Sequence, residues 1–142
     1  LEKGAEIVLG GKVDGRFVEP TIVTGVTSDM TLYRDETFGP VVSVIPFGTD
    51  EEAVAIANDT EYGLSSGVIT KDEYRGLGIA QKLETGMCHI NCSSVNDEPH
   101  APFGGLKSSG VGRHGGRWAT DTFTETRWIT LERGGRGFPP GF

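Results

Sequence analysis

The chain has 142 residues and a formal net charge of −7, from 13 lysines and arginines against 20 aspartates and glutamates. This length suffices for one domain with a core, and the apolar (36%) and charged (23%) fractions exclude wholesale disorder. The acidic balance argues against sequence-independent nucleic-acid binding, and no apolar run approaches the roughly 20 residues of a membrane-spanning helix.

The first half of the chain has short apolar runs separated by glycine and proline, which predicts strands and turns. Pro20 confines its run to a sheet edge or a bulge, because proline cannot donate to a strand ladder. The most hydrophobic run, ended by Pro46, is interpreted as a central strand. We therefore expect strands at 5–9, 17–23 and 41–47, and a short helix at 28–33.

The second half alternates helical and strand patterns. Thr49 and Asp50 can cap a helix whose first turn is acidic, which the helix dipole favours. Asp72 begins a second helix with apolar residues at helical spacing, and Gly86 stops it. The predicted elements are helices at 50–58, 72–85 and 116–122, and strands at 64–70, 87–91 and 124–131. This order predicts an α/β fold with crossovers on a largely parallel sheet.

Residues 102–116 contain six glycines, which predicts a long shaped loop that propagates neither helix nor strand. Residues 110–115 match G-x-G-x-x-G literally, but a dinucleotide fingerprint needs a strand that runs directly into the first glycine. No such strand precedes Gly110, and the fingerprint is rejected. The stretch 105–108 is not a phosphate-binding P-loop either, because Leu106 separates glycine from lysine.

Two cysteines, Cys88 and Cys92, are too few for a disulfide scaffold and indicate a reducing, cytoplasmic setting. Together with His89 and His100 they suggest zinc, but neighbours in a strand point to opposite faces and no C-x-x-C pair is present. No metal site is expected. Cys92 follows a predicted strand and could be a nucleophile, although the sequence places no obvious base beside it. A small thiol enzyme therefore stays open as an alternative.

Residues 36–41 combine a carboxylate, an aromatic ring and a Gly-Pro turn just before the strand at 41–47. In one interpretation Glu36 is a solvated acid and Phe38 an ordinary packing residue. In the other they form the lip of a ligand site, where the carboxylate accepts from a hydroxyl and the ring stacks on a flat heterocycle.

Taken together, the segments 36–41, 58–64 and 102–113, with Asn91 between them, resemble the C-terminal part of the aldehyde dehydrogenase superfamily. Order and intervals match over residues 1–131. His114 and the longer loop at 97–99 are most similar to members that act on benzaldehyde, salicylaldehyde or vanillin. The resemblance implies NAD(P)-dependent oxidation of an aldehyde to a carboxylic acid, in a parallel-sheet catalytic domain whose C-terminal part is residues 1–132. It leaves 133–142 as a flexible tail.

The resemblance also implies roles for single residues. Glu36 matches the carboxylate that binds the nicotinamide ribose, Phe38 the ring beside the nicotinamide, and Leu64 a further cofactor contact. Phe103 matches a wall of the aldehyde pocket, and the loop that begins with Asn91 and Cys92 matches the substrate entrance. We expect Glu36, Phe38 and Phe103 to face one cavity. The strand at 124–131 matches the one that pairs with a neighbouring subunit, giving a homodimer or homotetramer.

Neither cysteine matches the family's nucleophile, which is expected upstream together with the general base and the Rossmann half. The chain is therefore expected to be a fragment that is inactive alone and that associates through its open edges. The residues that would distinguish NAD from NADP are expected upstream as well. A second alternative is a non-catalytic oligomerisation module derived from the same fold.

Overall fold

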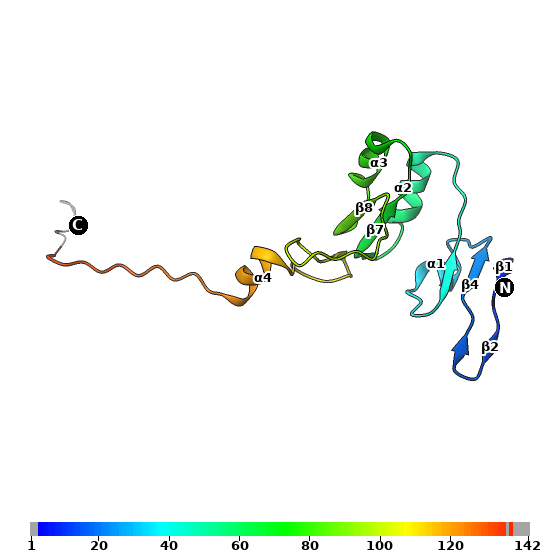
Figure 1. The fold of residues 1–142 in the computed structure, drawn as a ribbon, viewed down its shortest axis with the longest axis horizontal. Helices are drawn as coiled ribbons and strands as arrows, with labels where there is room; N and C mark the ends of the chain where they lie inside the picture. The colour runs from blue at the N-terminus through cyan, green and yellow to red at the C-terminus, as the bar shows by residue number, and fades with distance from the viewer. Residues whose placement is uncertain (1–2, 136, 138–142) are drawn as a thin grey trace.

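The computed structural model describes residues 3–135 and 137 (Figure 1). They form a mixed α/β fold. In chain order its elements are β1 (Glu6–Leu9), β2 (Val13–Asp14), β3 (Phe17–Val18), β4 (Thr21–Thr24), α1 (Thr31–Arg34), β5 (Val41–Ser43), α2 (Asp50–Asn58), β6 (Tyr62–Gly63), β7 (Ser65–Val68), α3 (Glu73–Ala80), β8 (Met87–Ile90), β9 (Leu106–Lys107) and α4 (Gly116–Phe123).

A three-stranded sheet in the order β1-β4-β5 forms the N-terminal part. β4 is antiparallel to β1 and parallel to β5, and the connection from β4 to β5 contains α1. Among the described residues the buried hydrophobic side chains are Val23 of β4 and, after it in the chain, Val26 and Met30. The strands β2 and β3 pair as a hairpin that projects away from it (Figure 1).

The expectation of a central strand at 41–47 was wrong for the part of the chain that the structure describes. β5 covers only Val41–Ser43 and lies at the end of the sheet, next to β4. Val42 and Phe47 are 53% and 57% exposed. A hydrophobic run predicts a buried strand. A central strand needs a neighbouring strand on each side, and β5 has only β4 among the described strands.

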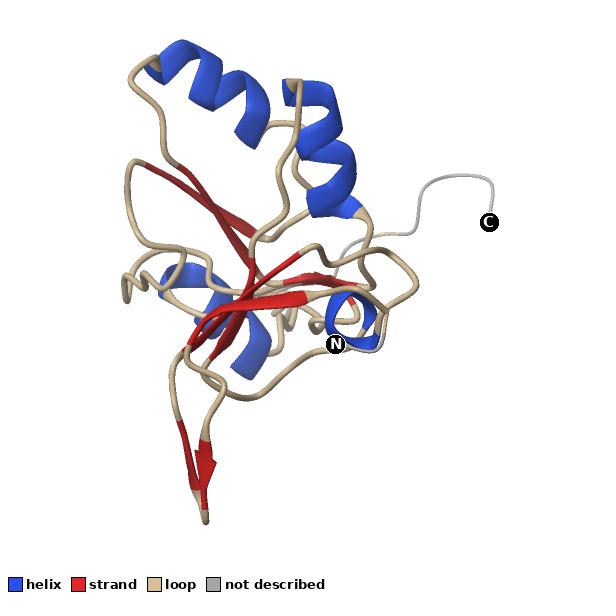
Figure 2. Ribbon diagram, turned by 90° about the vertical axis from the view of Figure 1, so that its right-hand side faces the viewer, coloured by secondary structure: helices blue, strands red, loops and turns tan. Residues whose placement is uncertain are grey.

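The second unit is built from β7, α3 and β8, with β7 and β8 parallel and α2 beside α3 (Figure 1 and Figure 2). Of the two predicted cap candidates Thr49 is the N-cap of α2, where it accepts from Glu52 N at 3.2 Å, and Asp50 is the first helical residue. Asp72, the predicted start of the second helix, is the N-cap of α3 and accepts from Arg75 N at 3.0 Å. α2 has the predicted bounds. α3 ends at Ala80, well before Gly86, because residues 81–83 leave the helix as a turn.

The glycine-rich run is more ordered than the sequence predicts. Leu106 and Lys107 form β9, antiparallel to β6, and Phe103 makes an isolated bridge with His114. Phe103 N donates to His114 O at 2.9 Å, and His114 N donates back at 2.7 Å. Glycines lie on both sides of Leu106–Lys107 and allow tight chain reversals. The run can therefore form short pairings such as β9 with β6, although it cannot form a longer strand.

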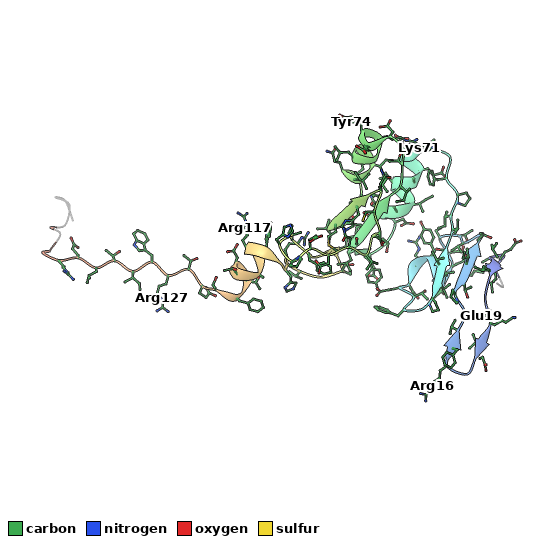
Figure 3. All side chains as sticks on the ribbon, in the orientation of Figure 1. Arg16, Glu19, Lys71, Tyr74, Arg117 and Arg127 are labelled. Atoms are coloured by element: carbon green, nitrogen blue, oxygen red, sulfur yellow. The ribbon has the colours of Figure 1, made fainter. Side chains whose placement is uncertain are left out.

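α4 begins as predicted, and the chain then continues as an extended, exposed segment (Figure 1). Over 124–131 it pairs with none of the described strands, and Arg127 points away from the other elements (Figure 3). The strand at 124–131 therefore stays a prediction that needs a partner. The predicted tail at 133–142 falls mostly on residues outside the described ones. Among the described helices none is long and apolar enough to cross a membrane.

Gly86 lies where β8 meets the glycine-rich loop, and a Cβ there would overlap the carbonyl oxygen of Gly104. We expect Gly86→Ala to lower the free energy of unfolding by more than about 2 kcal/mol, because two backbone segments would have to separate. Gly78→Ala is the matched control, since a Cβ at this position in α3 meets no atom within 4 Å. Denaturant unfolding measures both. Equal stability of the two variants would contradict this packing.

Candidate functional site

The loop 35–40 leaves the end of α1 and carries Glu36 and Phe38. Gly39 N donates to Thr37 O at 2.9 Å and Val41 N to Gly39 O at 2.8 Å, which folds the Gly-Pro turn. Phe38 is 94% exposed, and Glu36 accepts no hydrogen bond from any described residue. The loop thus presents a free carboxylate and a free aromatic face two residues apart.

The segment 58–64 lies beside this loop. Asp59 accepts hydrogen bonds from Tyr33 Oη at 3.0 Å and from Arg34 Nη1 at 3.1 Å, which joins α2 to the end of α1. The pKa of Tyr62 is raised, chiefly by the Glu61 carboxylate, then by burial, and then by the Glu36 carboxylate. Glu36 therefore lies within electrostatic range of the segment.

Leu64 follows directly in the same segment, between β6 and β7, and its side chain is 42% exposed. Its carbonyl oxygen accepts from Met87 N at 3.1 Å, so its backbone is tied to β8. The three residues predicted to contact a cofactor, Glu36, Phe38 and Leu64, thus come from a loop and a segment that lie next to each other.

Lys107 holds the segment 58–64 against the glycine-rich loop. Its ammonium donates to Asn58 O at 2.8 Å and to Thr60 O at 3.0 Å, and it pairs with Glu84 Oε2 at 2.7 Å. Its φ of +51° is rare for a residue with a side chain. Nothing in the sequence pattern indicates these contacts, because the two partner carbonyls belong to the backbone.

Phe103 lines a cavity of ≈ 230 Å³ together with residues 86–89, 96–98, 101 and 102. His89 lies in this wall, and its Nε2 is buried without a hydrogen-bond partner among the described residues. The lining includes neither Glu36 nor Phe38. This cavity therefore does not join Phe103 to Glu36 and Phe38 in the single wall that the sequence predicted. The sequence gives no signal for the buried His89 nitrogen.

Asn91 and Cys92 begin the loop that was predicted to form the substrate entrance. Asn91 has a φ of +56°, and its Oδ1 accepts from Thr70 N at 2.8 Å, so its amide fixes the end of β8. It lines a cavity beside α3, separate from that of Phe103. Cys92 is exposed, and its Sγ receives a long contact of 3.8 Å from Asn96 Nδ2.

Within the described residues no three histidine, cysteine, aspartate or glutamate side chains are grouped so that they could hold a metal ion. Cys88 and Cys92 are both free thiols. The described polar contact of Cys92 is an amide, which cannot take a proton from the thiol as a base would.

Comparisons with known proteins agree on one family. The profile described as "Aldehyde dehydrogenase family" matches residues 1–129. A vanillin dehydrogenase from Pseudomonas fluorescens is 46% identical over 139 residues, which are 98% of this chain and 29% of that protein. The crystal structure of a salicylaldehyde dehydrogenase from Pseudomonas putida G7, complexed with salicylaldehyde, superposes with a TM-score of 0.90 at 46% identity and covers 97% of this chain.

A Mycobacterium tuberculosis aldehyde dehydrogenase complexed with NAD+ superposes with a TM-score of 0.84 at 40% identity, covering 96% of this chain. This chain covers 28% of the salicylaldehyde dehydrogenase and 29% of the Mycobacterium tuberculosis protein. It therefore spans less than a third of the length of these relatives.

The contacts of Lys107 lead to a test of the site's framework. Lys107→Met keeps the length of the side chain but removes the described donor to Thr60 O and to Glu84, while Asn58 O still accepts from Thr60 N at 2.8 Å. We expect the free energy of unfolding to fall by about 0.5–1.5 kcal/mol, the net contribution of hydrogen bonds between partly exposed groups. Lys71→Met at an exposed loop is the control and should change it by less than about 0.5 kcal/mol. A loss no larger than that of the control would contradict the role of Lys107.

Proposed function

Because the chain belongs to the aldehyde dehydrogenase family, we propose that the protein oxidises an aromatic aldehyde to the carboxylic acid with NAD or NADP. The family membership confirms the resemblance drawn from the four motifs. The aromatic substrate is supported by the similarity to vanillin and salicylaldehyde dehydrogenases. Since the chain spans 29% of the vanillin dehydrogenase, we propose that residues 1–132 act as the C-terminal part of a longer catalytic domain.

The cofactor-binding part of this proposal uses Glu36, Phe38 and Leu64. An ionised carboxylate accepts strong hydrogen bonds from hydroxyl groups such as those of a ribose, and Glu36 has no competing donor among the described residues. The Phe38 ring is 94% exposed and offers a face to a flat heterocycle. Leu64 adds apolar surface nearby. A bound nicotinamide supplies an acceptor for the hydride of the aldehyde.

The substrate-binding part uses Phe103, Asn91 and Cys92. Phe103 offers an aromatic wall against which the ring of an aromatic aldehyde can pack in an offset or edge-to-face arrangement. Asn91 has a structural role in this part of the proposal. Its amide oxygen accepts from Thr70 N and so fixes the start of the entrance loop. The exposed sulfur of Cys92 lies at that entrance.

The chain alone is proposed to be inactive. Cys88 lies within β8, and the polar contact of Cys92 is an amide. Neither setting activates a thiol for attack on a carbonyl. The alternative of a non-catalytic oligomerisation module draws on the exposed segment at 124–131. Turnover in the whole protein separates the two, because a module of that kind would not oxidise aldehydes.

The role of Glu36 is tested by Glu36→Gln in the whole protein. The amide still accepts a hydrogen bond but has lost its charge, so the nicotinamide ribose is held less firmly. We expect weaker binding of NAD(P)H and slower hydride transfer, each by roughly tenfold. The rate of hydride transfer is measured by stopped-flow absorbance at the NAD(P)H band. A comparison with the deuterated aldehyde shows whether hydride transfer limits that rate.

Glu19→Gln is the matched control for charge, because Glu19 is exposed beside the hairpin, away from the site (Figure 3). It should leave both quantities unchanged. If Glu36→Gln behaved like this control, the cofactor role of Glu36 would be refuted.

The proposed subunit contact of 124–131 is tested with Trp128→Pro and Ile129→Pro. Neighbouring N–H groups of a strand point to opposite edges, so at least one of these changes removes a donor from an intersubunit ladder. We expect at least one to reduce the assembly's mass in light scattering. Trp128→Phe and Ile129→Val keep the donors and serve as controls. Unchanged mass in both proline variants would exclude pairing through this segment.

A further inference from the structure

The loop that carries Glu36 and Phe38 follows α1, a helix too short to be stable without contacts to other elements. α1 has four residues, and no side chain caps its N-terminus. A single helical turn is unstable in isolation, because nucleation fixes several residues for one hydrogen bond. Within the loop, Asp35 N donates to Thr31 O at 2.8 Å, which ties its first residue to that turn. The position of Glu36 therefore depends on what holds the end of α1.

Apolar packing holds one side of α1, since Leu32 and Tyr33 lie against the buried cluster that contains Met30. Asp59 is the polar support of its C-terminal end. One carboxylate oxygen accepts from Tyr33 Oη at 3.0 Å and the other from Arg34 Nη1 at 3.1 Å. Arg34 Nε also donates to Ser28 O at 2.7 Å, so the same guanidinium reaches back to the residues before the turn. The last two residues of α1 are thereby fastened to the end of α2.

The backbone at Asp59 is itself fixed by hydrogen bonds. It is the C-cap of α2, and its backbone N–H donates to Ala55 O at 3.1 Å. The adjacent Asn58 side chain donates to Lys82 O at 2.9 Å and accepts from Glu84 N at 2.8 Å. The longer helix α2 and the connection between α3 and β8 thus hold one end of the contact, and the single turn α1 lies at the other.

The surroundings of Asp59 also favour its ionised form. The hydrogen bond from Tyr33, followed by that from Arg34, lowers the pKa of Asp59 below its usual value. Burial, and then the hydrogen bond to Asp59, raises the pKa of Tyr33. At neutral pH the contact consists of a carboxylate, a phenol that keeps its proton and a guanidinium.

We propose that Asp59 is a positioning residue, which sets the loop 35–40 by holding Tyr33 and Arg34 so that Glu36 and Phe38 face the nicotinamide ribose. This inference rests on the function proposed above for Glu36. Asp59 touches neither cofactor nor substrate in it and acts through α1.

The test uses Asp59→Asn in the whole protein, since the amide keeps the shape and can still accept from Tyr33 but loses the charge that holds Arg34. Without cofactor, hydrogen exchange of the amides at 35–39 should become several-fold faster. The Kd for NADH, from fluorescence titration, should rise roughly tenfold. Tyr33→Phe removes a single hydrogen bond and is the milder second variant if Asp59→Asn does not fold.

Asp50→Asn is the matched control, because Asp50 also lies on α2 and pairs with an arginine, Arg75, whose Nε is 2.7 Å from Asp50 Oδ2. That pair joins α2 to α3 and does not involve α1. The control should leave both the exchange at 35–39 and the Kd unchanged. A purely stabilising role of Asp59 predicts that Asp50→Asn and Asp59→Asn behave alike.

The double variant Glu36→Gln with Asp59→Asn separates this inference from the proposed function. If Asp59 acts through Glu36, its substitution raises the Kd much less in the Glu36→Gln background than in the wild type. If Glu36→Gln weakens NADH binding while Asp59→Asn changes neither exchange nor Kd, the positioning role is refuted and the proposed function stands. If Glu36→Gln has no effect, both are overturned.

Discussion

The hydrogen bonds of the segment 58–64 hold the parts of this chain together. Backbone groups outside regular structure need partners when water is excluded, and this segment makes hydrogen bonds to three regions of the chain. Lys107 reaches its carbonyls from the glycine-rich loop, and Gly63 N donates to Ser109 Oγ at 2.9 Å. Gly86 N donates to Gly63 O at 2.9 Å from the start of β8, and Asp59 receives the end of α1. Loss of this segment's geometry would remove the hydrogen bonds that join the end of α1, and with it the loop 35–40, to α2.

Polar contacts matter for holding the described residues together because few of their hydrophobic side chains are buried. Three hydrophobic side chains of the described residues are buried, whereas large apolar ones such as Phe17, Phe38 and Trp128 are 81–94% exposed. A groove of ≈ 700 Å³ along the N-terminal sheet is lined largely by apolar residues. Apolar surface of this extent normally lies against another surface. The proposed function accounts for these exposed faces, since in it residues 1–132 act within a longer, oligomeric catalytic domain.

The sequence predicted the elements whose signals are local. Thr49 and Asp72 were recognisable as caps from their residue type and the acidic turn that follows, and α2 and α3 begin where they indicate. The contacts of Lys107 and Asp59 could not be predicted in this way. Their partners lie 23 or more residues away, and the partners of Lys107 include backbone carbonyls that carry no sequence signal. The strand β5 was misjudged because hydrophobicity indicates burial but not which neighbour provides it.

The motif at 36–41 was recognisable because its residue types suit a ligand, but its position depends on contacts that the motif does not contain. Asp59 and Arg34 have side chains that are 47% and 50% exposed, and ion pairs at this exposure add little to global stability. Their effect on the loop can still be large, because Asp59 holds the last two residues of α1, which lead directly into the loop. The contact between Asp59 and α1 therefore determines geometry more than stability, so the placement of Glu36 can change while the fold stays intact.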